Sequence, residues 1–154
     1  MFTKEEAKAI KTEFWTAFGV YMRKHQSQSG KKIKWVNYLT GVKDIYFRLY
    51  ADRNEAKVSI DLQHRNEGIR TLFFEQFKSL EHLLPEPFKS NALWLSHAEH
   101  PTKGQFSAIF VSIDQVNIYR KDDWSKMFLF YETNILCLDE FWSEFSEIFV
   151  DLSS

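Results

Sequence analysis

The stretch DIYFRLYADRNEAKVSIDLQH, residues 44–64, decides the fold because it reads as two strands joined by a tight turn. Apolar and polar side chains alternate in both halves, and successive side chains of a strand point to opposite faces of a sheet. The polar residues 52–55 between the halves suit a hairpin turn. Pairing Ala51 with Ala56 places both apolar sets on one face, as a buried face requires. The apolar set is Ile45, Phe47, Leu49, Ala51, Ala56, Val58, Ile60 and Leu62.

The other face of this hairpin carries the candidate functional side chains. They are Asp44, Tyr46, Arg48, Lys57, Ser59, Asp61 and Gln63. On one interpretation they form the solvated face of a half-covered antiparallel sheet, where Arg48 pairs with Asp61 across the strands. On the other interpretation, Asp44 and Asp61 belong to a metal or phosphate site.

The composition bounds the class of protein. The chain has 154 residues, of which 44% are hydrophobic and 27% charged, so we expect one globular domain over residues 1–154. Fifteen Phe and five Trp predict an aromatic core. The formal net charge of −1 gives no overall attraction to nucleic acid or to an anionic membrane.

The single cysteine, Cys137, excludes an internal disulfide and a cysteine-based metal cluster. Its apolar neighbours predict that it is buried. The N-terminus lacks the pattern of a signal peptide, and no apolar run approaches membrane-spanning length. We therefore expect a cytoplasmic protein without membrane contact.

Helical patterns lie on both sides of the hairpin. A capping box that begins at Thr3 and an apolar periodicity predict a helix over about residues 3–26. Residues 35–39 read as a strand. After the hairpin, Asn66 precedes a second helix, which Pro85 ends.

Two further strands are predicted over residues 91–95 and 105–113, and residues 116–119 continue the second strand after a bend. The turn-rich residues 97–104 read as a loop between them. This loop contains His97, Glu99 and His100, whose spacing matches no strong zinc pattern.

The C-terminal region is helical and strongly apolar. Residues 122–151 form either one kinked helix or two helices, in which case Asp139 is the N-cap of the second. The apolar stripe after Asp139 is Phe141, Trp142, Phe145, Ile148, Phe149 and Leu152. This surplus of aromatic residues leaves room for a homodimer contact.

One dense basic cluster precedes the hairpin and consists of Lys31, Lys32 and Lys34. Lysines at a strand edge discourage edge-to-edge pairing, which is one interpretation of the cluster. The alternative is a patch that contacts the phosphates of nucleic acid.

We predict an α+β fold: a central mixed sheet of about five strands flanked by helices, followed by C-terminal helices. The order of the first six elements, αβββαβ, is similar to the core of the PD-(D/E)xK superfamily, the restriction-endonuclease-like fold. That resemblance implies a metal site formed by Asp44 and Asp61, with Gln63 in place of the superfamily lysine. Lys57 or Arg48 would then supply the missing positive charge.

The implied metal is Mg²⁺, which prefers hard oxygen ligands and can activate a water for attack on a phosphate. A competing set matches the acid-x-Lys pattern literally. It consists of Asp52 with Glu55-Ala56-Lys57, at the hairpin turn, where such charges are usually solvated.

Three segments carry a closer resemblance over nearly the whole chain. They are Trp35-Val36-Asn37-Tyr38, Thr40-Gly41-Val42-Lys43-Asp44-Ile45-Tyr46-Phe47-Arg48 and Leu138-Asp139-Glu140-Phe141-Trp142. They resemble a bacterial family, domain of unknown function 4268. The family also occurs as the C-terminal module of longer proteins suspected of DNA restriction or repair roles, and it implies no assigned activity.

The sequence favours a non-catalytic or degenerate nuclease-like module that associates with nucleic acid or with a protein partner. The first alternative is a Mg²⁺-dependent nuclease that uses Asp44, Asp61 and Gln63. The second is an oligomeric protein-interaction domain built on the C-terminal helices.

Overall fold

The central hairpin forms in the predicted register. In the computed structural model, which describes residues 2–102 and 104–153, strands β1 (Ile45–Ala51) and β2 (Glu55–Leu62) pair antiparallel. Ala51 lies opposite Ala56, and Arg48 and Asp61 lie on the face opposite the buried Phe47 and Ile60. The alternation of side chains therefore predicted this part of the fold correctly, because one face has to be buried.

The sheet has four strands, not five, and every pairing in it is antiparallel. Strands β3 (Leu93–His100) and β4 (Gly104–Asp114) complete the order β1-β2-β4-β3. The predicted strand over residues 35–39 is wrong, because this segment is a loop that packs Trp35 into the core. With that strand missing, the αβββαβ order and the restriction-endonuclease-like core are not confirmed.

The predicted loop over residues 97–104 is also wrong up to His100, because β3 continues along β4 as far as that residue. A bulge between Leu95 and Ala98 shifts the register and hides the strand period in the sequence. Lys103, in the same segment, lies outside the described residues. Residues 116–119 do not extend β4, because Gln115 adopts a positive φ of 57° and redirects the chain.

The helices begin where their caps predict. Helix α1 (Lys4–Tyr21) starts with a complete Thr3 capping box and continues as the 3₁₀ turn η1 (Met22–Lys24). Asn66 caps helix α2 (Glu67–Ser79) by accepting a hydrogen bond from the backbone of Ile69. The remaining elements are η2 (Glu81–Leu83), α3 (Phe88–Asn91), η3 (Lys121–Asp123) and α4 (Trp124–Ser153).

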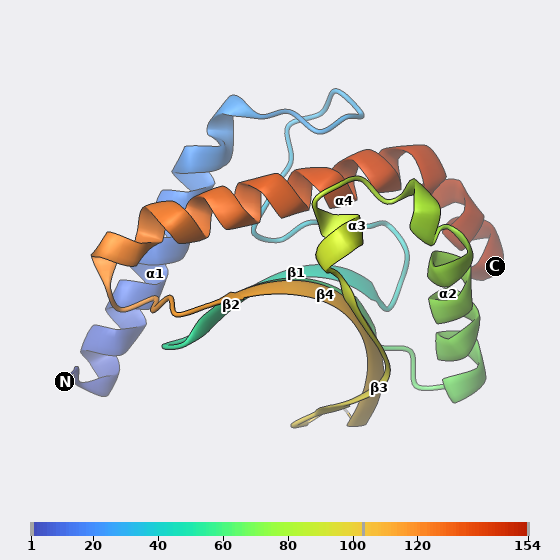
Figure 1. Ribbon diagram of the computed structural model, residues 1–154, viewed down its shortest axis with the longest axis horizontal. Helices are drawn as coiled ribbons and strands as arrows, with labels where there is room; N and C mark the ends of the chain where they lie inside the picture. The colour runs from blue at the N-terminus through green and yellow to red at the C-terminus, as the bar shows by residue number, and fades with distance from the viewer. Residues whose placement is uncertain (1, 103, 154) are drawn as a thin grey trace.

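The C-terminal region is one helix of 30 residues, which resolves the choice between one helix and two. Figure 1 shows α4 crossing one face of the sheet, with α1 near one of its ends and α2 near the other. The opposite face of the sheet is concave and is not covered by any of the helices that the structure describes.

The aromatic stripe of α4 packs against other elements of the same domain. Trp142 and Phe149 are buried, and both rings pack on Phe77 of α2. The homodimer contact that the stripe suggested stays a prediction. Because Trp142 and Phe149 are buried, such a contact would involve exposed residues of α4 such as Leu129 and Val150. None of the described helices is both long and apolar enough to span a membrane.

Candidate functional site: the concave face of the sheet

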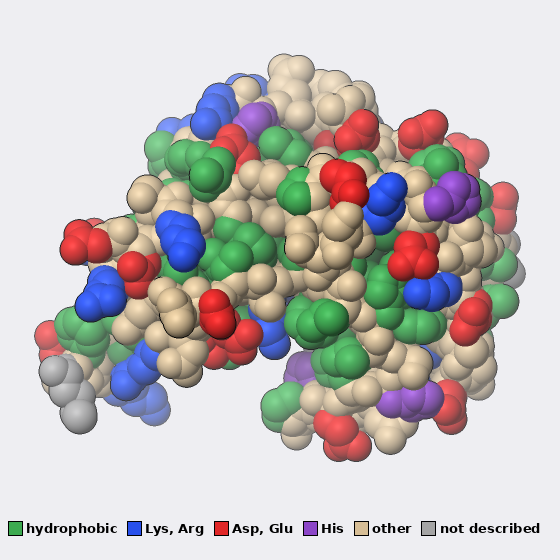
Figure 2. Space-filling view, in the orientation of Figure 1, with side chains coloured by type: hydrophobic (Ala, Val, Ile, Leu, Met, Phe, Trp, Pro, Cys, Tyr) green, Lys and Arg blue, Asp and Glu red, His purple; other side chains and the backbone are tan. Residues whose placement is uncertain are grey.

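A groove of about 320 Å³ runs over the uncovered face of the sheet. We call it the sheet groove, and Figure 2 shows the molecule hollowed on this side. Its lining residues are Arg48, Leu49, Tyr50, Lys57, Ser59, Asp61, Leu95, Ala98, Phe106, Ala108 and Phe110. Because β1 and β2 supply mainly the polar residues and β3 and β4 the apolar ones, the groove has a charged half and an apolar half.

Asp61 lies in the charged half of the sheet groove. Its side chain is only 14% exposed, and its carboxylate accepts a hydrogen bond from the Ser59 hydroxyl. Arg48 Nε lies 3.7 Å from Asp61 Oδ2. Burial raises the pKa of Asp61, and the Ser59 hydrogen bond and the positive charges of Arg48, His100 and Lys57 offset only part of that rise. Asp61 is therefore a carboxyl group held partly out of water beside cations.

The two cations of the groove lie against aromatic rings. The Arg48 guanidinium is 4.2 Å from the centre of the Tyr46 ring. Lys57 Nζ is 5.1 Å from the ring centre of Phe110 and 5.6 Å from that of Tyr50. All three distances lie within the range of cation–π attraction.

Asp44 is not beside Asp61 in this groove. It has a positive φ of 70° just before β1 begins, and it lines a different hollow with Lys43, His64 and Arg65. The predicted partner Gln63 uses its backbone N–H to donate to Asp44 O at 2.9 Å. The reason for the difference is that β1 begins only at Ile45, so the strand alternation does not extend back to Asp44.

The described residues contain no group of three or more His, Cys, Asp or Glu side chains that could hold a metal ion together. The Mg²⁺ site of Asp44 and Asp61 therefore stays a prediction. The competing residue Asp52 acts in the turn itself, because its Oδ1 accepts hydrogen bonds from the backbone N–H groups of Asn54 and Glu55.

The basic cluster lies away from the sheet groove. Lys31, Lys32 and Lys34 are exposed in the loop after η1, on the helix side of the sheet. Lys32 and Lys34 line a hollow of about 700 Å³ beside α1, and this hollow shares no lining residue with the sheet groove. The structure therefore does not join the basic cluster to Arg48 and Lys57.

A buried acid whose role the sequence did not reveal holds this loop in place. Asp139 is 1% exposed in the middle of α4 and accepts hydrogen bonds from Ser27 Oγ at 2.7 Å, Gln28 N at 2.8 Å and Tyr38 Oη at 2.6 Å. Burial and the hydrogen bond to Asp139 raise the pKa of Tyr38. Asp139 is thus an anchor for the loop and not a helix cap, the role that it would have had in the two-helix alternative.

The three sequence segments that carried the family resemblance meet at this anchor. Trp142 Nε1 donates to Thr40 O at 2.7 Å, and the Trp142 ring packs edge-on against Phe47. The Tyr38 ring also contacts Phe47. Packing between loop, helix and strand therefore brings these three segments together. The sequence signal for this anchor was an acid, Asp139, inside an otherwise apolar stripe of the helix.

Of the comparisons with known proteins, the one with family models agrees with the family resemblance seen in the sequence. Searches of curated proteins and of solved structures gave no match. A family model described as Domain of unknown function (DUF4268) matches residues 10–146, which include most of α1, the anchored loop, the sheet and most of α4. The chain belongs to this family of domains of unknown function, DUF4268.

Proposed function

We propose that this domain is a non-catalytic module that binds single-stranded nucleic acid in the sheet groove. The observation that carries the proposal is the division of the groove into two halves. Arg48 and Lys57 come from the strands of the charged half, Phe106 and Phe110 line the apolar half, and Lys57 Nζ lies over the Phe110 ring where the two halves meet. A single strand offers phosphates to the first half and unstacked bases to the second.

The chemistry of each half matches a part of a nucleotide. Base stacking on aromatic side chains contributes about 1–3 kcal/mol per base and tolerates any sequence. In the charged half, Ser59 and Asp61 supply hydrogen-bonding groups that can bind a base edge. A duplex keeps its bases stacked on one another and gains less from this surface.

The two cations remain available to a ligand. Arg48 lies 3.7 Å from Asp61, and Lys57 lies 3.7 Å from Glu55, so both ion pairs are long. The side chains of Arg48 and Lys57 are 46% and 34% exposed. The partly exposed pair of Lys57 and Glu55 contributes only about 0–1 kcal/mol, so exchanging it for a phosphate contact costs little.

The test is fluorescence anisotropy with labelled single strands of DNA and of RNA, about 12 nucleotides long, and with a duplex of the same sequence. We expect the single strands to bind more tightly than the duplex, with affinity that falls as salt rises. Lys57→Ala and Phe110→Ala should each weaken binding by about fivefold or more. Lys126→Ala, at an exposed position on α4, is the matched control and should leave binding unchanged.

A further arm separates the groove from the basic cluster. Replacing Lys31, Lys32 and Lys34 by Ala together should weaken binding only through long-range charge, so the loss should disappear at high salt. If this triple variant abolishes binding while Lys57→Ala and Phe110→Ala do not affect it, the sheet groove is not the site.

A Mg²⁺-dependent nuclease is the second candidate, and the partly buried Asp61 beside Arg48 favours it. In that case Asp61 and Asp44 would be metal ligands, and the metal would supply an activated water. Incubation of labelled single- and double-stranded DNA and RNA with Mn²⁺ and Mg²⁺ tests it. Cleavage by the wild type that Asp61→Asn and Asp44→Ala abolish would replace the binding-module proposal with the nuclease.

A further inference from the structure

Strand β1 forms one edge of the sheet, and its ladder to β2 fixes which backbone groups face outward. Gln63 N donates to Asp44 O at 2.9 Å before β1, and Asp52 N donates to Glu55 O at 3.0 Å after it. Hydrogen-bonded and non-bonded pairs alternate along an antiparallel ladder. The even-numbered residues of β1 therefore bond to β2, and the odd-numbered residues turn their N–H and C=O groups to the free edge.

The first part of this edge is occupied by the chain itself. Thr40 Oγ1 donates to Ile45 O at 2.8 Å, and Phe47 is only 3% exposed. Leu49 and Ala51 are half-buried, and their outward N–H and C=O groups have no hydrogen-bond partner among the described residues. Backbone groups that are half-buried and unpaired are costly unless water or another chain satisfies them.

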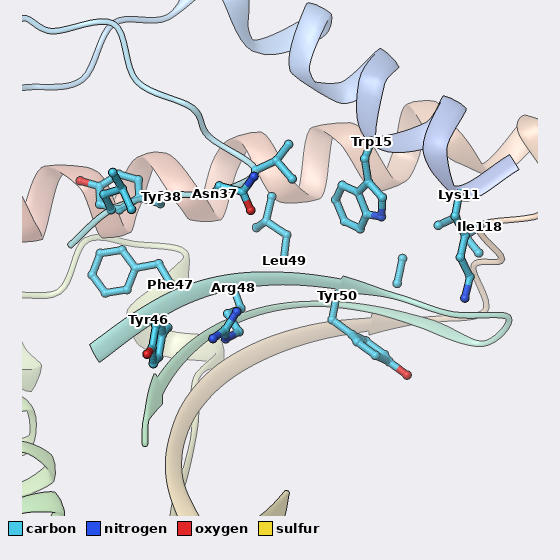
Figure 3. A pocket seen from close by; sticks show the side chains of 13 residues that line it. Lys11, Trp15, Asn37, Tyr38, Tyr46, Phe47, Arg48, Leu49, Tyr50 and Ile118 are labelled. Carbon is cyan, nitrogen blue, oxygen red and sulfur yellow. The ribbon is translucent and has the colours of Figure 1, made fainter. Parts of the chain in front are cut away.

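A hollow of about 450 Å³ lies along this edge, and Figure 3 shows its lining. Trp15 of α1 and Leu49 lie on the helix side of β1, whereas Tyr46, Arg48 and Tyr50 lie on the other side. Lys11 and Ile118 stand at one end. The lining contains Lys11 and Arg48 and, among the residues that the structure describes, no acidic side chain.

We propose that this edge hollow binds one extended segment of a partner protein, which adds a strand to β1 and carries acidic and apolar residues in alternation. Its main chain pairs with the N–H and C=O groups of Leu49 and Ala51, the mode of strand addition. Because neighbouring side chains of a strand point to opposite sides, apolar ones face Trp15 and acidic ones face Arg48.

A second copy of this chain fits the edge poorly. Two copies paired through β1 about a two-fold axis present the same surface to each other, so the positive charges of Lys11 and Arg48 lie across from their own copies. The sequence of β1, IYFRLYA, also has no acid to offer. The charge of the hollow therefore favours a different, acidic chain, and the inference goes beyond the binding of nucleic acid in the sheet groove.

The experiment uses the whole domain and two fluorescent peptides of about seven residues, a usual strand length. One alternates Val and Glu, and the other alternates Val and Lys. We expect the Val–Glu peptide to bind at least about tenfold more tightly than the Val–Lys peptide, and to shift the backbone amide resonances of Leu49 and Ala51.

Ala51→Pro removes the outward N–H of Ala51 without touching the ladder to β2, since Pro is tolerated on a strand edge. It should weaken peptide binding by about tenfold, whereas Ala51→Ser, which keeps the N–H, should not. Lys11→Glu should also weaken binding, and Lys126→Glu is its control; this pair tests the proposal even if the proline variant does not fold. Binding that none of these variants changes, or no binding of the Val–Glu peptide up to about 1 mM, overturns the proposal.

Discussion

Asp139 is the residue on which the loop between α1 and β1 depends. Its carboxylate takes three hydrogen bonds from Ser27, Gln28 and Tyr38, at a position in α4 that is 1% exposed. A buried carboxylate is tolerated when its lone pairs are satisfied in this way, and each donor is in turn satisfied by it. Loss of the carboxylate therefore leaves these three donors, of which Ser27 is buried and Tyr38 half-buried, without this acceptor.

Asp139→Ala should lower the free energy of unfolding by about 3 kcal/mol, because breaking a buried polar cluster leaves unsatisfied groups. The measurement is urea unfolding followed by tryptophan fluorescence. Glu140→Ala, at the exposed neighbouring position, should change stability by less than about 0.5 kcal/mol. Equal effects of the two substitutions would show that Asp139 is not an anchor.

Asp61 gives a prediction about pH. Burial raises its pKa above the usual value of 3.8, so the folded protein retains a proton at a pH where the unfolded chain has lost it. Its contribution to stability is therefore fully present below pH 3.8 and is lost as the pH rises through the raised pKa. Asp61→Asn removes this titration and the loss that goes with it.

We therefore expect the stability of Asp61→Asn relative to wild type to increase as the pH rises from about 3 to about 7. Urea midpoints of both proteins across this range provide the comparison, and subtracting one from the other cancels the other carboxyl groups. A difference that stays constant, or that changes in the opposite direction, contradicts a raised pKa for Asp61.

At the scale of elements, α4 organises the helix side of the sheet. Its buried residue Phe149 contacts Phe77 of α2, with ring centres 4.3 Å apart, and Trp142 reaches Phe47 of β1. The helix therefore joins α2, the sheet and the anchored loop. Leu129, on its outer side, is 59% exposed and contributes little to this packing.

Phe149→Ala should reduce the free energy of unfolding by about 3–5 kcal/mol, the usual cost of removing a buried aromatic ring. Leu129→Ala, on the same helix, should cost less than about 0.5 kcal/mol. Chemical denaturation of the two variants measures the difference. A small effect of Phe149→Ala would mean that the end of α4 is peripheral to the core.

The elements that the sequence predicted well are those whose period follows from a single buried face. The hairpin register and the caps at Thr3 and Asn66 belong to this group. Residues 35–39 were misread because Trp35 is buried in the core and Tyr38 donates a hydrogen bond to Asp139 of α4, more than a hundred residues away, whereas no neighbouring strand pairs with this segment among the described residues. Local pattern contains no information about such a partner.

The candidate site was predictable only in part, for a similar reason. Arg48, Lys57 and Asp61 follow from strand alternation, and they do line one groove. Asp44 was placed with them by extending that alternation past the start of β1, where the backbone has a positive φ. His100 was assigned to a loop because the bulge in β3 hides its period, although its charge acts on Asp61.

At the scale of the whole molecule, the groove depends on the curvature of the sheet. Strands β3 and β4 bend away from the helices, and the concave face that results is shown in Figure 1. The apolar half of the groove comes from these two strands and the charged half from β1 and β2. The chain as a whole has a net charge of −1, so attraction to nucleic acid has to come from this local arrangement.

The most direct test of the sheet groove as the binding site is the map of backbone amide resonances on addition of a single-stranded oligonucleotide of about 12 nucleotides. We predict that the largest shifts belong to Arg48, Lys57, Asp61, Ala108 and Phe110, on the concave face, and that they saturate together. Shifts confined to the loop of residues 31–34, or no shifts at oligonucleotide concentrations up to about 1 mM, would contradict the account.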